Sequence, residues 1–226
     1  MASADTPDKP ARFFRRRTFV VPTWRVAVPS LVLIAALAFF VVKNTYGWLA
    51  ISEPIENAPC LIVEGWLPDY ALQTSAERAK QSDISKVFCT GIPIDRGTLV
   101  YSYGNYARYA SETLGRMGVP VEKITQVSAP LSRTERSRTM ARALRVHLDS
   151  TDIPAADRRI NLITLGTHAR RSRNVFQEEL GESWQVGVVS VPDQESDPDR
   201  WFLQSNAAKN VISELIALTL GVFGAN

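Results

Sequence analysis

The chain has 226 residues, with 45% hydrophobic and 22% charged side chains, a composition that supports a packed globular core. Its formal net charge of +3 is unevenly spread, because residues 1–50 hold seven of the 26 basic residues and two of the 23 acidic ones. The other 19 basic and 21 acidic residues nearly balance, which argues against a nucleic-acid-binding domain with a basic surface.

An apolar run of 17 uncharged residues, Val26 to Val42, follows the basic head and is just long enough to span a bilayer as a helix. Six Lys and Arg precede the run, and after Lys43 the next basic residue is Arg78. The positive-inside rule therefore places the N-terminus in the cytoplasm and the remainder outside. We expect a cytoplasmic head (1–24), an uncleaved transmembrane anchor (25–44), a linker (45–59) and an extracytoplasmic domain (60–226), rather than a cleaved signal peptide.

The domain alternates between apolar, β-branched runs and stretches of helical period. The runs lie at 60–63, 86–90, 123–127, 160–165 and 185–191. This alternation predicts an α/β fold, Rossmann-like and doubly wound, with a mainly parallel five-stranded sheet after one N-terminal transmembrane helix. We expect Cys60 and Cys89 to be buried thiols in neighbouring strands, and two histidines without metal-ligand spacing predict no metal site. The apolar tail Leu215–Phe223 is expected to be a core helix, with membrane contact as the alternative.

Ligands of open parallel sheets bind beyond the carboxyl ends of the strands. Those ends carry Glu64, Gly65 and Trp66 after the first strand, Thr90 and Gly91 after the second, Ser132, Arg133 and Thr134 after the third, and Gly166, Thr167, His168 and Arg171 after the fourth. Helix starts and arginines attract anions, so we expect a phosphate or pyrophosphate ligand. No GxGxxG, P-loop or GxSxG motif occurs, and no cofactor is predicted.

Several of these residues also have ordinary structural interpretations. Glu64 is the best carboxylate candidate for catalysis, but its role could instead be a structural hydrogen bond to a backbone loop. Trp66 could stack on a ligand or merely cover the end of the sheet. Thr167 could be a simple helix N-cap. Arg170 and Arg173 are expected to be solvated helix surface.

These strand ends resemble the bacterial YdcF/SanA/ElyC family, the domain of unknown function 218, over about residues 58–216. The sequence ITLGTHARRS is similar to the family's strand followed by His-x-x-Arg, RMGVPVEKI to its Leu-Gly-Val-Pro-x-x-x-Ile step, and VFCTG to its strand ending in Ser-Gly-Gly. The resemblance implies that His168 and Arg171 are site residues and that Thr90 and Gly91 are loop residues. It also implies a Rossmann-like fold and a link to envelope biogenesis, including lipid-carrier metabolism. The family's Thr-x-Glu-Asn is replaced here by TERS, residues 134–137. This departure indicates a divergent branch of the family.

We therefore expect a single-pass protein of the bacterial inner membrane whose extracytoplasmic domain binds a phosphorylated or lipid-linked glycan precursor of envelope biogenesis. As an enzyme it would use Glu64 or His168 as general acid or base. Arg171, Arg133 and the backbone amides of residues 166–167 would bind the phosphate of the substrate. The alternative is a non-catalytic binding or scaffold subunit of a membrane complex, which the TERS substitution favours. Expected partners are an anionic small molecule or polyprenyl-linked precursor, the lipid bilayer and a membrane protein complex, but not nucleic acid. A cytoplasmic nucleotide or methyl-donor enzyme would require the opposite topology.

Overall fold

The computed structural model describes residues 21–95 and 99–223, and the chain divides into two units, Met1–Val41 and Val42–Asn226. Most of the predicted basic head lies outside the described residues. The first helix, α1, spans Trp24–Leu49. At about 1.5 Å per residue its 26 residues exceed the ~30 Å hydrocarbon core of a bilayer. By length and composition, α1 can therefore cross a membrane.

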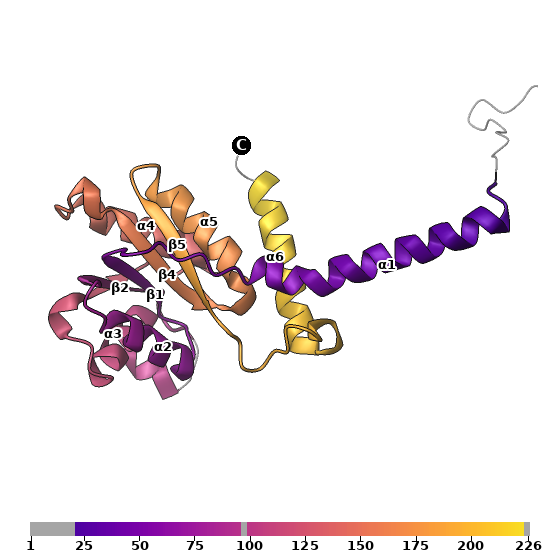
Figure 1. The fold of residues 1–226 in the computed structure, drawn as a ribbon. Helices are drawn as coiled ribbons and strands as arrows, with labels where there is room; N and C mark the ends of the chain where they lie inside the picture. The colour runs from indigo at the N-terminus through magenta and orange to yellow at the C-terminus, as the bar shows by residue number, and fades with distance from the viewer. Residues whose placement is uncertain (1–20, 96–98, 224–226) are drawn as a thin grey trace, which may run out of the picture. The chain divides into compact units, whose positions relative to one another are not determined.

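A five-stranded, all-parallel sheet forms the centre of the second unit (Figure 1). Its strands are β1 Cys60–Glu64, β2 Lys86–Gly91, β3 Ile124–Ser128, β4 Arg159–Leu165 and β5 Gln185–Val191, in the order β3-β2-β1-β4-β5. The central strands are almost wholly buried, because helices cover both of their faces. The predicted doubly wound α/β fold is confirmed.

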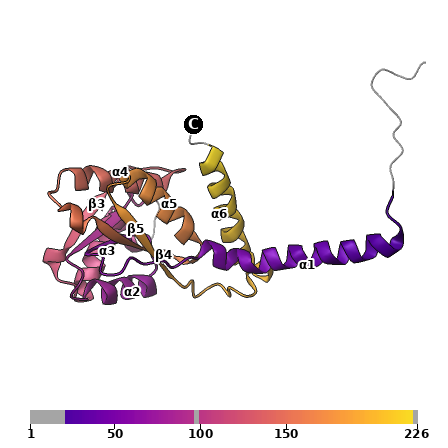
Figure 2. The same cartoon turned by 45° about the horizontal axis from the view of Figure 1, so that its top comes forward.

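Two pairs of helices cover the two faces of the sheet (Figure 2). Helices α2 (Asp69–Ala79) and α3 (Tyr106–Arg116) pack on one face, and α4 (Arg136–Asp149) and α5 (Ala169–Leu180) pack on the other. Cys60 and Cys89 are buried, unpaired thiols in the adjacent strands β1 and β2, as predicted. Burial raises the pKa of these thiols to about 11 and about 12, so both stay protonated.

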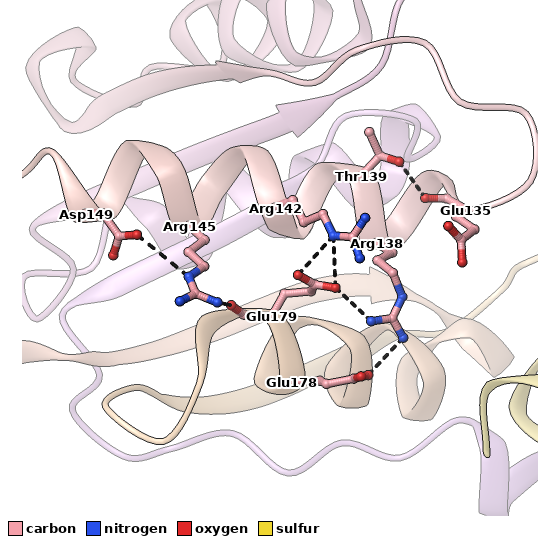
Figure 3. Close-up of polar contacts among 8 residues, drawn as sticks. All are labelled: Glu135, Arg138, Thr139, Arg142, Arg145, Asp149, Glu178 and Glu179. Atoms are coloured by element: carbon pink, nitrogen blue, oxygen red, sulfur yellow. Dashed lines mark hydrogen bonds and ion pairs between the residues drawn. The ribbon is translucent and has the colours of Figure 1, made fainter. Parts of the chain in front are cut away.

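Ion pairs fasten α4 to α5 along their outer surfaces (Figure 3). The guanidinium of Arg138 lies 2.9 Å from Glu178 and 2.7 Å from Glu179, and Arg142 reaches Glu179 at 3.2 Å. Arg145 donates to the Glu179 backbone carbonyl at 3.1 Å. This network holds α4 to the C-terminal end of α5 on one face of the sheet.

The segment between α1 and β1 belongs to the folded unit and does not behave as a free linker. The backbone groups of Glu53 exchange two hydrogen bonds with Val188 of β5, and those of Ile55 bond the Asn161 side chain. Asn161 is fully buried in β4, so this edge of the sheet has its polar groups satisfied by residues 53–55.

The last helix, α6, spans Ser205–Phe223 and packs on the end of α1. Tyr46 and Leu49 form a small core with Trp201, Ala207 and Val211. The expectation of a core helix is wrong for residues 215–221, because every side chain in that range is at least partly exposed. Among the described side chains, the inward-facing ones in the first half of α6 and Glu214 are buried against the body of the domain, and Leu218 packs partly against the same small core.

Candidate functional site

The site lies at the topological switch point of the sheet, between β1 and β4. From β1 the chain winds outward through β2 to β3 and then returns to β4 on the other side of β1. The loops that follow β1 and β4 therefore leave in opposite directions and open a place for ligands at the carboxyl edge. Glu64 ends β1, and Thr164 lies one residue before the end of β4.

Glu64 is a fully buried carboxyl group at this edge. The Thr164 hydroxyl donates a short hydrogen bond to Oε2 of Glu64, and the Ser172 hydroxyl lies 3.4 Å from Oε1. Burial raises the pKa of Glu64, and the hydrogen bond from Thr164 and the nearby charges of His168 and Arg171 only partly oppose it. The environment therefore favours the protonated acid, which can donate a hydrogen bond or a proton.

A second carboxylate, Glu214 of α6, holds His168 and Arg171. Its Oε1 lies 2.6 Å from Nδ1 of His168, and its Oε2 lies 2.5 Å from Nε of Arg171. Nη2 of Arg171 adds a second bond to Oε1 at 3.0 Å, which makes the pair bidentate. Burial would raise the pKa of Glu214, but the hydrogen bonds and charges of His168 and Arg171 lower it to about 2.

This arrangement orients the histidine. Because Nδ1 of His168 is engaged by Glu214, Nε2 is the ring atom left for a ligand. The imidazole packs edge-on against Trp66, with ring centroids 5.1 Å apart, and its side chain is 29% exposed. Trp66 follows Glu64 by two residues in the turn after β1, so this turn places the indole beside the histidine.

The buried hydroxyl of Thr90 lies next to Glu64 in the sheet. The two residues are register partners on β2 and β1, so their side chains point to the same face. Thr90 is fully buried, and its Oγ1 has no hydrogen-bond partner among the residues that the structure describes. Buried hydroxyls usually have a partner, so Thr90 offers bonding capacity beside Glu64.

The two glycines predicted at these strand ends have a packing role. A Cβ on Gly65 would lie 2.3 Å from the Tyr106 carbonyl, and one on Gly91 would lie 2.1 Å from the Ala107 nitrogen. Glycine at both positions lets the first turn of α3 approach the ends of β1 and β2. The N–H of Gly65 already donates to the Thr90 carbonyl at 2.7 Å and is not free for an anion.

The predicted residues after β3 lie apart from this cluster. Arg133 and Thr134 are exposed, and the Ser132 hydroxyl accepts a hydrogen bond from the Glu135 N–H at 3.2 Å. None of the three makes a hydrogen bond or ion pair with Glu64, His168 or Arg171. From this region Ser137, at the start of α4, reaches the site and accepts from Nη1 of Arg171 at 3.2 Å.

The turn after β4 also differs in detail from expectation. Gly166 has a φ of 47°, a left-handed conformation that glycine adopts easily, and Thr167 is buried. Thr167 is not the N-cap of α5, because that position falls on His168 and has no side-chain capping bond. The Gly166–His168 turn thus delivers the imidazole to the site.

Two arginines expected on solvated surface are tied to the fold. Arg170 donates from Nε to the Trp48 carbonyl at 2.6 Å, and its guanidinium lies 4.3 Å from the centre of the Trp48 ring. Arg173 donates to the Val186 carbonyl at 3.2 Å. Arg170 therefore links the start of α5 to the end of α1.

Sequence reasoning brought Glu64, Trp66, Thr90, His168 and Arg171 to the site but missed Glu214. Its signal was one carboxylate inside the apolar run VISELIALTL, where an unpaired charge would be costly. Between residues 21–95 and 99–223, no group of three or more His, Cys, Asp or Glu is placed to hold a metal ion.

No protein-family model, curated protein or solved structure gives a significant match to this chain. The function is therefore argued from the residues of the site itself.

Proposed function

We propose that this chain is a membrane-anchored envelope protein, a divergent relative of the YdcF/SanA/ElyC family. Its α/β domain would lie outside the bacterial inner membrane and bind and process a phosphorylated or lipid-linked glycan precursor. The observation that carries the proposal is the pairing of two differently tuned carboxyl groups around one histidine at the switch point of the sheet. Groups of this kind with opposite pKa shifts are typical of acid–base sites.

The charge of the cluster suits an anionic ligand. Glu214 and Arg171 cancel each other, and a protonated Glu64 adds no negative charge. Arginine has five N–H groups, and the contacts with Glu214 and Ser137 engage three of them. Nη2 also lies 3.4 Å from Nδ1 of His168, so the Nη1 hydrogen that is not bonded to Ser137 is the donor left for a phosphate oxygen while Arg171 stays on Glu214.

The roles of the acid and the base follow from their protonation. Glu64, whose pKa is raised by burial, donates a proton to the leaving oxygen as the phosphoester bond breaks. His168, oriented by Glu214 through Nδ1, accepts a proton at Nε2 from the attacking water. Since Glu64 has no exposed surface, a ligand reaches it only after neighbouring side chains have moved aside.

A test uses the purified full chain in nanodiscs with a lipid extract of its own membrane, and product masses are followed over time. An acid–base group contributes typically ~10²–10⁴ in rate, so His168→Ala should reduce turnover by at least ~10². Glu64→Gln should retain ligand binding and lose turnover, because glutamine preserves the shape but donates no proton. Full activity in His168→Ala would remove His168 from catalysis.

A second candidate function is non-catalytic ligand binding or scaffolding within a membrane complex. It is favoured by the internal pairing of the site, because Arg171 is bound to Glu214 and Glu64 to Thr164 without any ligand. In that case Glu64→Gln would leave both ligand binding and cellular function unchanged. Loss of function with retained binding would instead identify catalysis.

A further inference from the structure

The second half of α6 carries apolar side chains that the rest of the described chain leaves uncovered. Ile212, Leu215, Ile216 and Leu220 are 52%, 36%, 54% and 65% exposed. Their spacing of three, four and eight residues places them on one face of the helix. We call these four residues the α6 stripe. A contiguous apolar strip on a helix is typical of an interaction surface rather than of scattered surface residues.

The approach to α6 is fastened where the apolar run of α1 ends. The Trp201 indole Nε1 donates to the carbonyl of Val42, the last residue of that run, at 3.0 Å. The next residue, Lys43, lies 3.9 Å from Asp199. Both contacts lie within the folded unit, so the turn before α6 sits at the level where α1 changes from apolar to charged.

The same turn has the residue types of a membrane interface. It reads Trp201-Phe202-Leu203, and Leu203 is 74% exposed. Trp201 itself is buried against Tyr46 and Leu49, so Leu203 is the side chain of this turn that can enter a bilayer interface. From this turn α6 crosses the last turns of α1 (Figure 1), with Ala207 and Val211 packed on Tyr46 and Leu49.

We propose that α6 is an interfacial helix, whose stripe lies in the headgroup and acyl boundary of the bilayer that α1 crosses. The folded unit then contacts the membrane at the α6 stripe as well as through α1. Lys209 is exposed one turn before Ile212 on the same face, where its ammonium can meet lipid phosphates. A lipid surface fits this face better than a second copy of the chain, because the turn that leads into α6 is hydrogen-bonded to Val42, where the apolar run of α1 ends.

This contact bears on the candidate site through the opposite face of α6. Glu214 points inward from the helix to His168 and Arg171, while its neighbours Leu215 and Ile216 point outward. A bilayer that holds α6 therefore holds the carboxylate that orients His168. The inference requires only that α1 crosses a bilayer, and it stands independently of the proposed reaction.

The test measures water accessibility on the full chain in nanodiscs of phosphatidylcholine and phosphatidylglycerol. A nitroxide is attached to a cysteine introduced by Ile216→Cys, and the matched control is Val146→Cys on α4, where the side chain is 71% exposed. The native thiols Cys60 and Cys89 are buried, and the unsubstituted chain reports background labelling. The label at 216 should collide several-fold less with a water-soluble nickel complex, and more with oxygen, than the label at 146.

A second label at Leu220→Cys must agree with the first, and unchanged circular dichroism shows that each variant is folded. Equal nickel accessibility at 216 and 146 would overturn the proposal. The proposal would also be overturned if the shielding at 216 appeared together with spin–spin broadening and disappeared in nanodiscs that hold one chain each. In that case the α6 stripe would bind a second copy of the chain. Shielding that persists at one chain per nanodisc supports the bilayer as the occupant.

Discussion

The Glu214→Gln substitution tests whether this carboxylate is the electrostatic centre of the site. Glutamine keeps the size of the side chain but removes the charge opposite Arg171 and His168. In the native chain the pKa of Glu214 falls from 4.5 to about 2, although burial acts in the other direction. Each pH unit corresponds to ~1.36 kcal/mol, so the fold stabilises the ionised carboxylate by about 3 kcal/mol. Removing one partner of a buried ion pair typically costs ~3–5 kcal/mol, and the value of about 3 kcal/mol lies at the lower end of that range.

The pH dependence of this stabilisation has a definite sign. A carboxyl group whose pKa is lower in the folded state stabilises the protein above its unfolded pKa and loses that effect as the pH falls. The difference between the native chain and Glu214→Gln should therefore be about 3 kcal/mol at pH 7. It should shrink as the pH falls from about 4.5 toward about 2.

The assay is chemical denaturation of the full chain in mild detergent, followed by circular dichroism at pH 3, 5 and 7. Glu182→Gln is the matched control, because it makes the same substitution at an exposed carboxylate in the turn after α5. Its effect should stay within ~0.5 kcal/mol, as for ordinary surface substitutions. Equal stabilities of the two variants at pH 7, or a Glu214→Gln effect that does not change with pH, would refute the reasoning.

Three further sets of substitutions test other parts of the site. Because burial raises the pKa of Glu64, Glu64→Gln should gain stability over the native chain as the pH rises above 4.5, and a pH-independent difference would contradict this. Gly91→Ala should cost about 2 kcal/mol, since its Cβ would lie 2.1 Å from the α3 backbone, whereas Gly115→Ala, with open space around it, should stabilise α3 by ~0.5–1 kcal/mol. Equal melting temperatures of the two alanine variants would exclude the close approach. Thr90→Val should leave the stability unchanged or raise it, because the Thr90 hydroxyl lacks a hydrogen-bond partner. Thr164→Val should cost ~1–3 kcal/mol, because it removes a hydrogen bond to Glu64. A Thr90→Val variant that unfolds at a lower temperature than Thr164→Val would contradict this assignment of the two hydroxyls.

Local pattern predicted the sheet well because its three central strands are buried on both faces. Runs such as LIV in β1 and the β-branched residues of β5 are apolar throughout, and only a covered parallel sheet satisfies them. The observed strand order β3-β2-β1-β4-β5 places the ends of β1 and β4 together. This is why Glu64 and His168 were identified from sequence.

Long-range packing explains what the sequence did not predict. The helical pattern predicts that Glu214 lies on a helix, but it does not predict that this helix packs near the start of α5, where His168 and Arg171 lie. Similarly, the sequence around Arg170 indicates a solvated surface residue, and only the structure shows that its guanidinium lies over the Trp48 ring. Gly65 and Gly91 read as accessible backbone, and only the approach of α3 shows that they are packed. Each difference depends on a partner far away in the chain.

The central claim is that the His168 site binds a phosphorylated ligand, and native mass spectrometry of the full chain extracted from its own membrane tests it most directly. We predict that the native chain carries a phosphorus-containing molecule in a 1:1 complex. The occupancy should fall sharply in His168→Asn and stay unchanged in Arg133→Ala, whose side chain lies in the exposed loop away from the cluster. A ligand-free native chain, or a ligand retained equally by both variants, would contradict the account.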